Sequence, residues 1–257
     1  MLFTNAVSIF LPLSAYFVRP IICVAIESIF QRDNDPRSSQ TQLASGSAIE
    51  YGKVSNSLSW QASGPLYSGC NLSGVKISNC YQLTLSSDAT QNLEDYGSST
   101  PRQRTEFLTA SAAAGTTHKY QWSYYLKSPV GTSTHFFHLM QLFSRDDGGP
   151  ILTLDAINGV IAIKDNYRDC SKTGCPSIPL NTFTDKTTIH TIAVTYGPSN
   201  GIFKYIITDS ATSEVLLSYS ASGNMGGNAS IKFGTYRLAV SNMKNSVAAL
   251  GDFKVLA

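Results

Sequence analysis

The stretch Ile231-Lys232-Phe233-Gly234-Thr235-Tyr236-Arg237-Leu238-Ala239-Val240 reads as a β-strand that carries polar groups where a plain core strand would not. Because side chains alternate along a strand, Lys232 and Tyr236 should project from one face and Arg237 from the other. Gly234 lies between the first two, and its missing side chain lets a ligand or another backbone come close. We interpret this face as the floor of a cleft; the alternative is an ordinary solvated sheet face.

Strand patterns of this kind recur along most of the 257-residue chain. Short apolar alternations bounded by Gly, Ser, Asn and Pro predict strands, and no segment shows a sustained helical period with caps. Asn158-Gly159, between two alternations, is a strong signal for a tight hairpin. The predicted strands are 81–86, 104–110, 118–127, 135–143, 151–155, 160–164, 188–196, 203–208, 214–219, 232–240 and 252–256. We therefore predict an all-β fold: an antiparallel β-sandwich or jelly roll of the concanavalin type.

The composition of the chain divides it into three successive segments. Residues 1–25 are largely apolar and end in small residues, which indicates a signal peptide and hence a secreted, extracellular protein. A membrane anchor is the alternative, but Pro12, Arg19 and Pro20 leave no clean spanning run. Residues 26–57 have no hydrophobic period and predict a flexible polar segment. Residues 58–257 are then the folded domain.

The nearly equal numbers of basic and acidic residues limit the kinds of partner that we expect the protein to bind. With a net charge of +2 and 14% of residues charged, the balance implies neither a nucleic-acid partner nor a strongly acidic partner, and we expect no nucleic acid to bind. Once the signal peptide is removed, we expect no membrane association and a monomer.

The cysteines suit an oxidising compartment. Cys70, Cys80, Cys170 and Cys175 remain after signal removal, and an even set in an extracellular chain suggests disulfides. Pairing of near neighbours, 70 with 80 and 170 with 175, is the simplest of three possibilities. Zinc is the alternative, but the sequence has no Cys-x-x-Cys and no nearby His pair.

The sequence also contains two glycosylation sequons and one acidic turn, all expected at the surface. The sequons that begin at Asn71 and Asn228 predict glycosylation if the chain enters a eukaryotic secretory pathway. The stretch Arg145-Asp146-Asp147-Gly148-Gly149 reads as a polar turn. Its two carboxylates could help to bind a structural calcium, although the pattern lacks a full set of oxygen ligands and favours a plain turn.

Two further predicted strands carry unexpected polar residues. Arg104 and Glu106 share one face of strand 104–110, where a surface ion pair is the plain explanation. His138 and Gln141 interrupt a very apolar strand, where a buried polar group is costly unless it is hydrogen-bonded or faces a cleft. Their odd separation places them on opposite faces of a regular strand, so both reach one cleft only if a bulge intervenes.

Together these strands resemble a known family. Arg104-Thr105-Glu106-Phe107, the strand of His138 and Gln141, and Lys232-x-Gly234-x-Tyr236 resemble the three signature strands of jelly-roll polysaccharide lyases, over roughly residue 58 to the C-terminus. The outer two motifs are similar to those of alginate lyases. In the middle motif His precedes Gln by three positions, an order more similar to glucuronan lyases (polysaccharide lyase family 20) and their heparin-lyase-like relatives.

The resemblance implies β-elimination of a 4-linked, glucuronan-like polyuronate, with no cofactor required for the chemistry. Arg104 and Gln141 would neutralise the substrate carboxylate, so that the C5 proton can be removed. Tyr236 matches the family's catalytic tyrosine, which serves as acid and often as base; Lys232 could lower the pKa of its phenol. His138 is the candidate base for a substrate whose proton and leaving group lie on opposite faces.

The predicted substrate-binding set adds Glu106 and Arg237 to Lys232, with Arg237 only at the cleft rim. A non-catalytic carbohydrate-binding sandwich is the alternative from another class, and a structural cell-surface protein is the third. Only the lyase requires Arg104, Gln141, Tyr236 and a histidine to converge on one point. A glycosidase needs paired carboxylates, and Glu106 has no obvious partner.

Overall fold

The computed structural model describes residues 40–257 of the chain. These residues contain seventeen strands, one short helix and one 3-10 turn, joined by loops. The elements are β1 (Thr41–Ala44), β2 (Glu50–Ser55), β3 (Leu58–Ala62), β4 (Leu66–Ser68), β5 (Cys80–Leu85), β6 (Arg102–Thr109), β7 (Ala112–Ala113), β8 (Thr117–Leu126), β9 (Phe137–Ser144), β10 (Gly149–Ile157), β11 (Val160–Asp165), α1 (Cys170–Thr173), β12 (Ser177–Pro179), η2 (Leu180–Thr182), β13 (Thr187–Thr195), β14 (Gly201–Asp209), β15 (Val215–Gly223), β16 (Asn228–Leu238) and β17 (Ser246–Leu256). The predicted signal peptide lies outside the described residues. Within them, no helix is long and apolar enough to cross a membrane.

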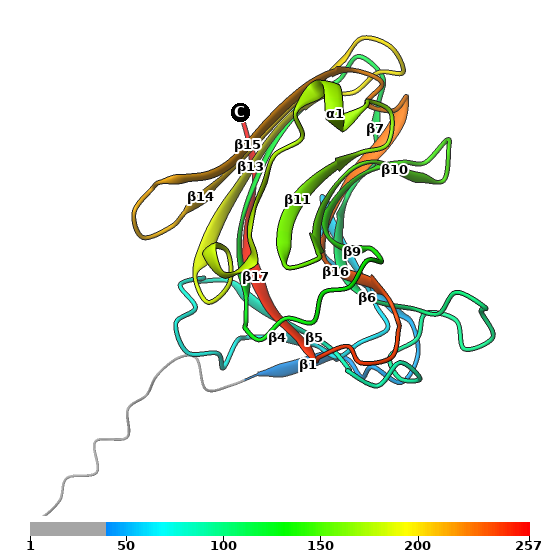
Figure 1. Ribbon diagram of the computed structural model, residues 1–257, viewed down its shortest axis with the longest axis vertical. Helices are drawn as coiled ribbons and strands as arrows, with labels where there is room; N and C mark the ends of the chain where they lie inside the picture. Colours follow the sequence, from blue (N-terminus) through cyan, green and yellow to red (C-terminus); the bar gives the residue numbers. More distant parts are fainter. Residues whose placement is uncertain (1–39) are drawn as a thin grey trace, which may run out of the picture. The chain divides into compact units, whose positions relative to one another are not determined.

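The strands form two sheets that pack as a sandwich, seen as two curved layers in Figure 1. One sheet has the order β1-β4-β5-β17-β8-β13-β14-β15, and the other the order β12-β11-β10-β9-β16-β6-β3-β2, with β7 paired to β16. All pairings between named strands are antiparallel. The predicted all-β antiparallel sandwich is confirmed.

Each of the eleven predicted strands corresponds to a strand of the structure, and the largest shift is the start of β17, at Ser246 rather than residue 252. The folded region begins earlier than the predicted boundary at residue 58. The strands β1 and β2 lie inside the segment 26–57 that we expected to be flexible, and they pair with β4 and β3. Most residues of β2 are exposed, so the strand has no apolar alternation to reveal it.

The core between the sheets is rich in aromatic residues. Trp122 on β8 stacks on Phe233 of β16 with ring centroids 4.5 Å apart, and Phe107 of β6 lies 6.1 Å from the same ring. All three side chains are buried. These contacts turn Phe233 and Phe107 inward, so their neighbours along β16 and β6 face away from the other sheet.

One histidine belongs to this core. His190 on β13 is buried, and its ring nitrogens hydrogen-bond Tyr205 at 2.6 Å and Thr188 at 3.0 Å. Burial lowers the pKa of His190 to about 3, so the ring is neutral in the folded protein.

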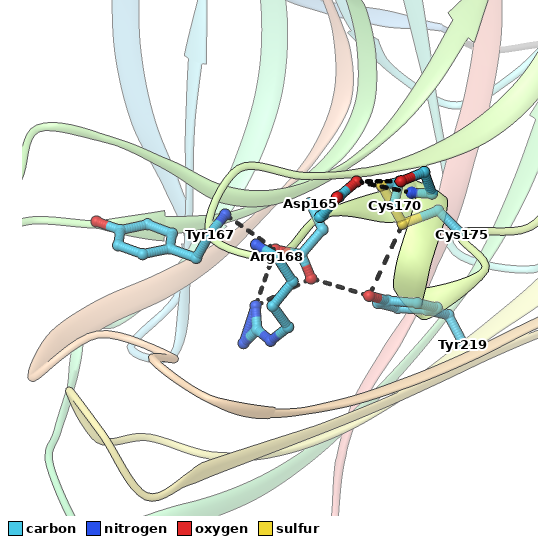
Figure 2. Close-up of a disulfide and its surroundings, with 8 residues drawn as sticks. Asp165, Tyr167, Arg168, Cys170, Cys175 and Tyr219 are labelled. Atoms are coloured by element: carbon cyan, nitrogen blue, oxygen red, sulfur yellow. Dashed lines mark hydrogen bonds and ion pairs between the residues drawn. A yellow bond between two sulfur atoms is a disulfide. The ribbon is translucent and has the colours of Figure 1, made fainter.

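Both predicted disulfides are present, Cys70–Cys80 and Cys170–Cys175. The second closes the short helix α1, which is the setting of Figure 2. Beside it, the buried Asp165 carboxylate accepts two hydrogen bonds from Arg168, at 2.8 and 2.9 Å, and one from the Tyr219 hydroxyl at 2.9 Å. This network fixes the connection that follows β11.

Candidate active site

A cleft of about 410 Å³ opens on the nine-stranded sheet, on the face turned away from the other sheet. The strands that carry the predicted site residues are neighbours there, in the order β9, β16, β6. The cleft is lined by Glu94, Arg102, Arg104, Phe136, His138, Gln141, Phe143, Gly148, Pro150, Lys232 and Tyr236. All four predicted catalytic residues and Lys232 therefore meet in one place. A second hollow, beside Cys70–Cys80, is lined by no charged residue.

A bulge in β9 explains how His138 and Gln141 share this cleft. The pairing of β10 with β9 shifts between Leu154 and Asp155, where one step along β10 matches two steps along β9. The extra residue is Leu139, which is buried. The odd spacing of His138 and Gln141 is thereby compensated, as the sequence required for a shared cleft.

A second irregularity, at Gly234 of β16, brings Tyr236 opposite His138. Gly234 has a positive φ of 146°, and a Cβ added there would lie 2.3 Å from the carbonyl oxygen of Thr105 on β6 and 3.2 Å from Leu83. The sequence left open whether Gly234 makes room for a ligand or for another backbone. The structure shows that it makes room for the backbone of β6.

His138 is held by a carboxylate that sequence reasoning missed. Its Nδ1 lies 2.5 Å from Oδ1 of Asp155 on β10, and Asp155 is buried. With Nδ1–H donating to this carboxylate, Nε2 keeps the lone pair that a general base needs. The sequence signal was an acidic residue inside the apolar strand 151–155, but the pairing of β10 with β9 was not readable from it.

Tyr236 and Arg104 form a stacked pair on adjacent strands. The Arg104 guanidinium carbon lies 4.0 Å from the centroid of the Tyr236 ring, and Arg104 makes an ion pair of 2.8 Å with Glu94. Arg104 Nε is buried without a hydrogen-bond partner among residues 40–257. Such a donor is poised for a ligand oxygen in the cleft.

The pKa of Tyr236 shifts in the direction opposite to the prediction. Burial raises the pKa of its hydroxyl above the usual value, and Arg104 opposes this without reversing it. The expectation that Lys232 lowers the pKa of Tyr236 is wrong, because the cation beside the ring is Arg104 and burial outweighs it. The phenol is therefore protonated in the free protein at neutral pH.

Glu106 lies beneath the cleft floor rather than in it. It is 1% exposed, and its carboxylate accepts hydrogen bonds from Gln141 at 2.5 Å and from Gln61 at 3.2 Å. An amide nitrogen carries two hydrogens, so Gln141 can donate one to Glu106 and the other to a ligand. The structure thus gives Glu106 a positioning contact with Gln141 instead of the predicted contact with substrate.

Lys232 lines the same cleft and is 5% exposed. Its Nζ lies 3.6 Å from the centroid of the Phe143 ring, a cation–π contact. Burial, partly offset by Glu106, lowers the pKa of Lys232 to about 8. The ammonium is therefore charged at neutral pH but loses its proton more easily than an exposed lysine.

Arg237, predicted at the cleft rim, is not brought to the cleft. Its side chain is fully buried on the opposite face of β16, where it donates to Gln103 Oε1 at 2.8 Å and to the backbone oxygens of Lys244 and Ser86 at 2.9 and 2.6 Å. Strand alternation places it there, as it does Phe233. Arg237 is a structural residue.

The side chain of Asp147 ties the turn at residues 145–149 to residues outside it. The Asp147 carboxylate accepts hydrogen bonds from Ser144 and Tyr167, both at 2.9 Å. Within residues 40–257, no group of three or more His, Cys, Asp or Glu residues could hold a metal ion. The structural calcium stays a prediction, as does glycosylation of Asn71 and Asn228, whose side chains are exposed.

Comparisons with known proteins add no family assignment. No protein-family model and no curated protein matches the sequence. Among solved structures, an alginate lyase of polysaccharide lyase family 7, AlgAT5, is 13% identical with a TM-score of 0.45, and the match covers 69% of this chain and 77% of that one.

Proteins of other functions match similarly. A family GH131 β-glucanase catalytic domain from Podospora anserina is 13% identical, with a TM-score of 0.47 and coverage of 69% and 72%. The lectin UEA-II, solved with galactose, is 8% identical, with a TM-score of 0.44 and coverage of 86% and 100%. All three matches have TM-scores below 0.5, so the function has to be derived from the cleft.

Proposed function

We propose that this protein is a polysaccharide lyase that cleaves a 4-linked polyuronate by β-elimination, with glucuronan as the preferred substrate. The observation that carries the proposal is the meeting of Arg104, His138, Gln141 and Tyr236 in one cleft on three adjacent strands. Each of these groups matches one requirement of the reaction.

The first requirement is to make the C5 proton acidic. That proton becomes removable only when the adjacent carboxylate is neutralised, because charge flows into the carboxylate as the C–H bond breaks. Arg104 offers a buried, unpartnered Nε–H, and Gln141 offers an amide hydrogen beside it in the cleft. Preorganised donors of this kind act without having to reorganise during the reaction.

The second requirement is an acid and a base. His138, with Nδ1 held by Asp155, takes the C5 proton at Nε2, and the C–H electrons form the C4–C5 double bond. The C4–O4 bond breaks, and O4 takes the proton of the Tyr236 hydroxyl. Tyr236 is protonated at neutral pH, as the acid role requires, and proton exchange through solvent then resets both side chains.

The stereochemistry favours a polymer of glucuronate or mannuronate over one of guluronate. His138 and Tyr236 are paired on adjacent strands with ring centroids 5.7 Å apart, so both approach the sugar from the sheet floor. In D-glucuronate and D-mannuronate the C5 proton and O4 lie on one face of the ring, whereas in L-guluronate they lie on opposite faces. We therefore assign His138 to same-face elimination, in place of the opposite-face role suggested by the sequence. The order of His before Gln favours glucuronate over mannuronate.

The competing functions fit less well. A glycosidase would need two carboxylates that face the substrate, but Glu106 is covered by Gln141 and Gln61. A carbohydrate-binding module needs exposed aromatic platforms and has no need of a His–Asp pair. Two disulfides suit an oxidising compartment, and we propose that the protein acts outside the cell.

The test is an incubation of purified protein with polyglucuronate, polymannuronate, polyguluronate and heparin, followed by ultraviolet absorbance of the unsaturated sugar end. We expect a rise with polyglucuronate, a smaller one with polymannuronate and none with polyguluronate. Tyr236→Phe should abolish the rise, because it removes the acid and leaves the packing of the ring.

A control variant separates chemistry from folding. Gln121 lies on β8, in the other sheet, so Gln121→Ala should leave turnover unchanged. Absence of product with every polymer, together with measurable polymer binding, would refute the lyase and leave the carbohydrate-binding sandwich. A rise with polyguluronate alone would keep the lyase but contradict same-face elimination.

A further inference from the structure

We infer that Lys232, Phe143 and Arg145 form a second carboxylate-binding subsite, which holds a uronic acid other than the one that reacts at Arg104 and Tyr236. The inference rests on the proposed function and extends it, because it makes a chain with more than one uronate the required substrate. It starts from a buried cation that the rest of the described chain leaves without an acceptor.

The ammonium of Lys232 has no hydrogen-bond acceptor and no salt-bridge partner among residues 40–257, although the residue is 95% buried. Its neighbour is the face of the Phe143 ring, at 3.6 Å. A buried charge without a partner is costly, and such groups mark places where a ligand supplies the missing charge. Because Lys232 lines the cleft, the ligand group that completes it is an anion.

A second cation stands beside the first. The Arg145 guanidinium carbon lies 5.5 Å from the centroid of the same Phe143 ring, and its NH2 group donates to Ser230 Oγ at 3.0 Å. Ser230 and Lys232 are two positions apart on β16 and share a face, and Phe143 is the register partner of Ser230. Arg145 is thus anchored next to Lys232, with donors left to reach a carboxylate.

The carboxylates near Lys232 and Arg145 contact other residues, so the two cations can bind an external anion. Glu106 and Glu94 attract Lys232, whereas Arg104 and Arg145 repel it. Glu106 is committed to Gln141 and Gln61, and Glu94 is committed to Arg104. Neither carboxylate neutralises the lysine directly.

The spacing separates this subsite from the reacting sugar. Lys232 lies four residues from Tyr236 along β16, and their register partners on β9, Gln141 and His138, lie three residues apart. The two positions are therefore roughly 10–13 Å apart, which is longer than one pyranose unit. Its side chain leans further away, towards Phe143 and hence towards Ser230. A carboxylate bound at Lys232 and Arg145 therefore belongs to another sugar of the same chain.

The experiment measures binding of hexaglucuronate and diglucuronate by calorimetry in the Tyr236→Phe protein, where turnover is blocked. We expect Arg145→Gln to weaken hexaglucuronate binding by up to about fivefold, as for a rim charge, and Lys232→Met by at least about tenfold, as for a buried charged contact. Arg145→Lys should restore most of the loss. Lys204→Gln, an exposed cation on β14 in the other sheet, is the matched control and should change nothing.

Two results would overturn the second subsite. One is hexaglucuronate binding within twofold of the parent in both Lys232→Met and Arg145→Gln. The other is an equal loss for the disaccharide, which would mean that these residues serve the reacting carboxylate. Turnover by the wild-type protein is read separately, so a protein that binds hexaglucuronate through Lys232 but forms no unsaturated product would refute the lyase and keep the subsite.

Discussion

Replacing Gly234 by alanine should damage both the fold and the site, and the structure gives the size of the effect. A Cβ at this position would lie 2.3 Å from Thr105 O and 2.9 Å from the Glu106 Cα, both backbone atoms of the central strand β6. The positive φ of 146° is also one that alanine rarely adopts. In addition, the Gly234 carbonyl accepts a hydrogen bond of 3.0 Å from Tyr124 of the other sheet, so the residue has little freedom to move away.

Two costs add up. The backbone conformation costs on the order of 1–3 kcal/mol for a residue other than glycine. Forcing a methyl group against a fixed backbone costs roughly another 1–3 kcal/mol. The lower entropy of the unfolded alanine chain returns about 0.4–1 kcal/mol. We therefore expect Gly234→Ala to lower the free energy of unfolding by about 2–5 kcal/mol, a large part of the roughly 5–15 kcal/mol of a typical domain.

Urea unfolding followed by tryptophan fluorescence measures this loss, and two other glycines separate its causes. Gly148 has a φ of 66° with nothing within 4 Å of an added Cβ, so Gly148→Ala should cost only about 1–2 kcal/mol for the conformation. Gly149 has open space and no positive φ, so Gly149→Ala should change stability by less than about 0.5 kcal/mol. A loss for Gly234→Ala no larger than that for Gly148→Ala would show that β6 does not confine the position.

Three other predictions concern titratable groups. Asp155→Asn should lower kcat by about 100- to 10,000-fold with little change in KM, measured by product absorbance, because His138 loses the carboxylate that fixes its tautomer. An unchanged kcat would show that Asp155 does not position the base. The pKa of His190 is lowered from 6.5 to about 3, so the unfolded state binds the proton more tightly. Up to about 5 kcal/mol of stability should therefore be lost as pH falls from 6.5 towards 3, and urea unfolding of His190→Gln should show a flatter pH dependence than the parent. Hexaglucuronate binding should weaken as pH rises through about 8, where Lys232 loses its proton, and calorimetry on Lys232→Met should show no such step.

The regular strands could be predicted from the sequence because their apolar and polar residues alternate with a period of two. The alternation of apolar and polar residues located β9, β16 and β6. It also placed Lys232 and Tyr236 on the same face of β16, and both line the cleft with Arg104 of β6. Alternation failed wherever the backbone departs from period two. The bulge at Leu139 could be required by the spacing of His138 and Gln141, but nothing in the sequence located it.

Long-range partners were also beyond sequence reasoning. Asp155 meets His138 only because β10 pairs with β9 across the bulge, and the direction of the pKa shift of Tyr236 depends on how deeply the ring is buried. Arg237 was assigned only to the cleft rim, because strand alternation turns it away from Lys232 and Tyr236. Three acceptors, at Gln103, Ser86 and Lys244, satisfy it inside the protein instead.

The positions of β16 and β17 have a consequence for synthesis of the protein. These last two strands do not lie at sheet edges: β16 inserts between β9 and β6, and β17 inserts between β5 and β8 (Figure 1). Until the ribosome has released both, each sheet is split into two halves with unpaired inner edges, which are the surfaces most prone to aggregation. Chains that stall before residue 228 should therefore depend on chaperones, and the cleft comes into existence only when one of the last segments of the chain enters the middle of its sheet.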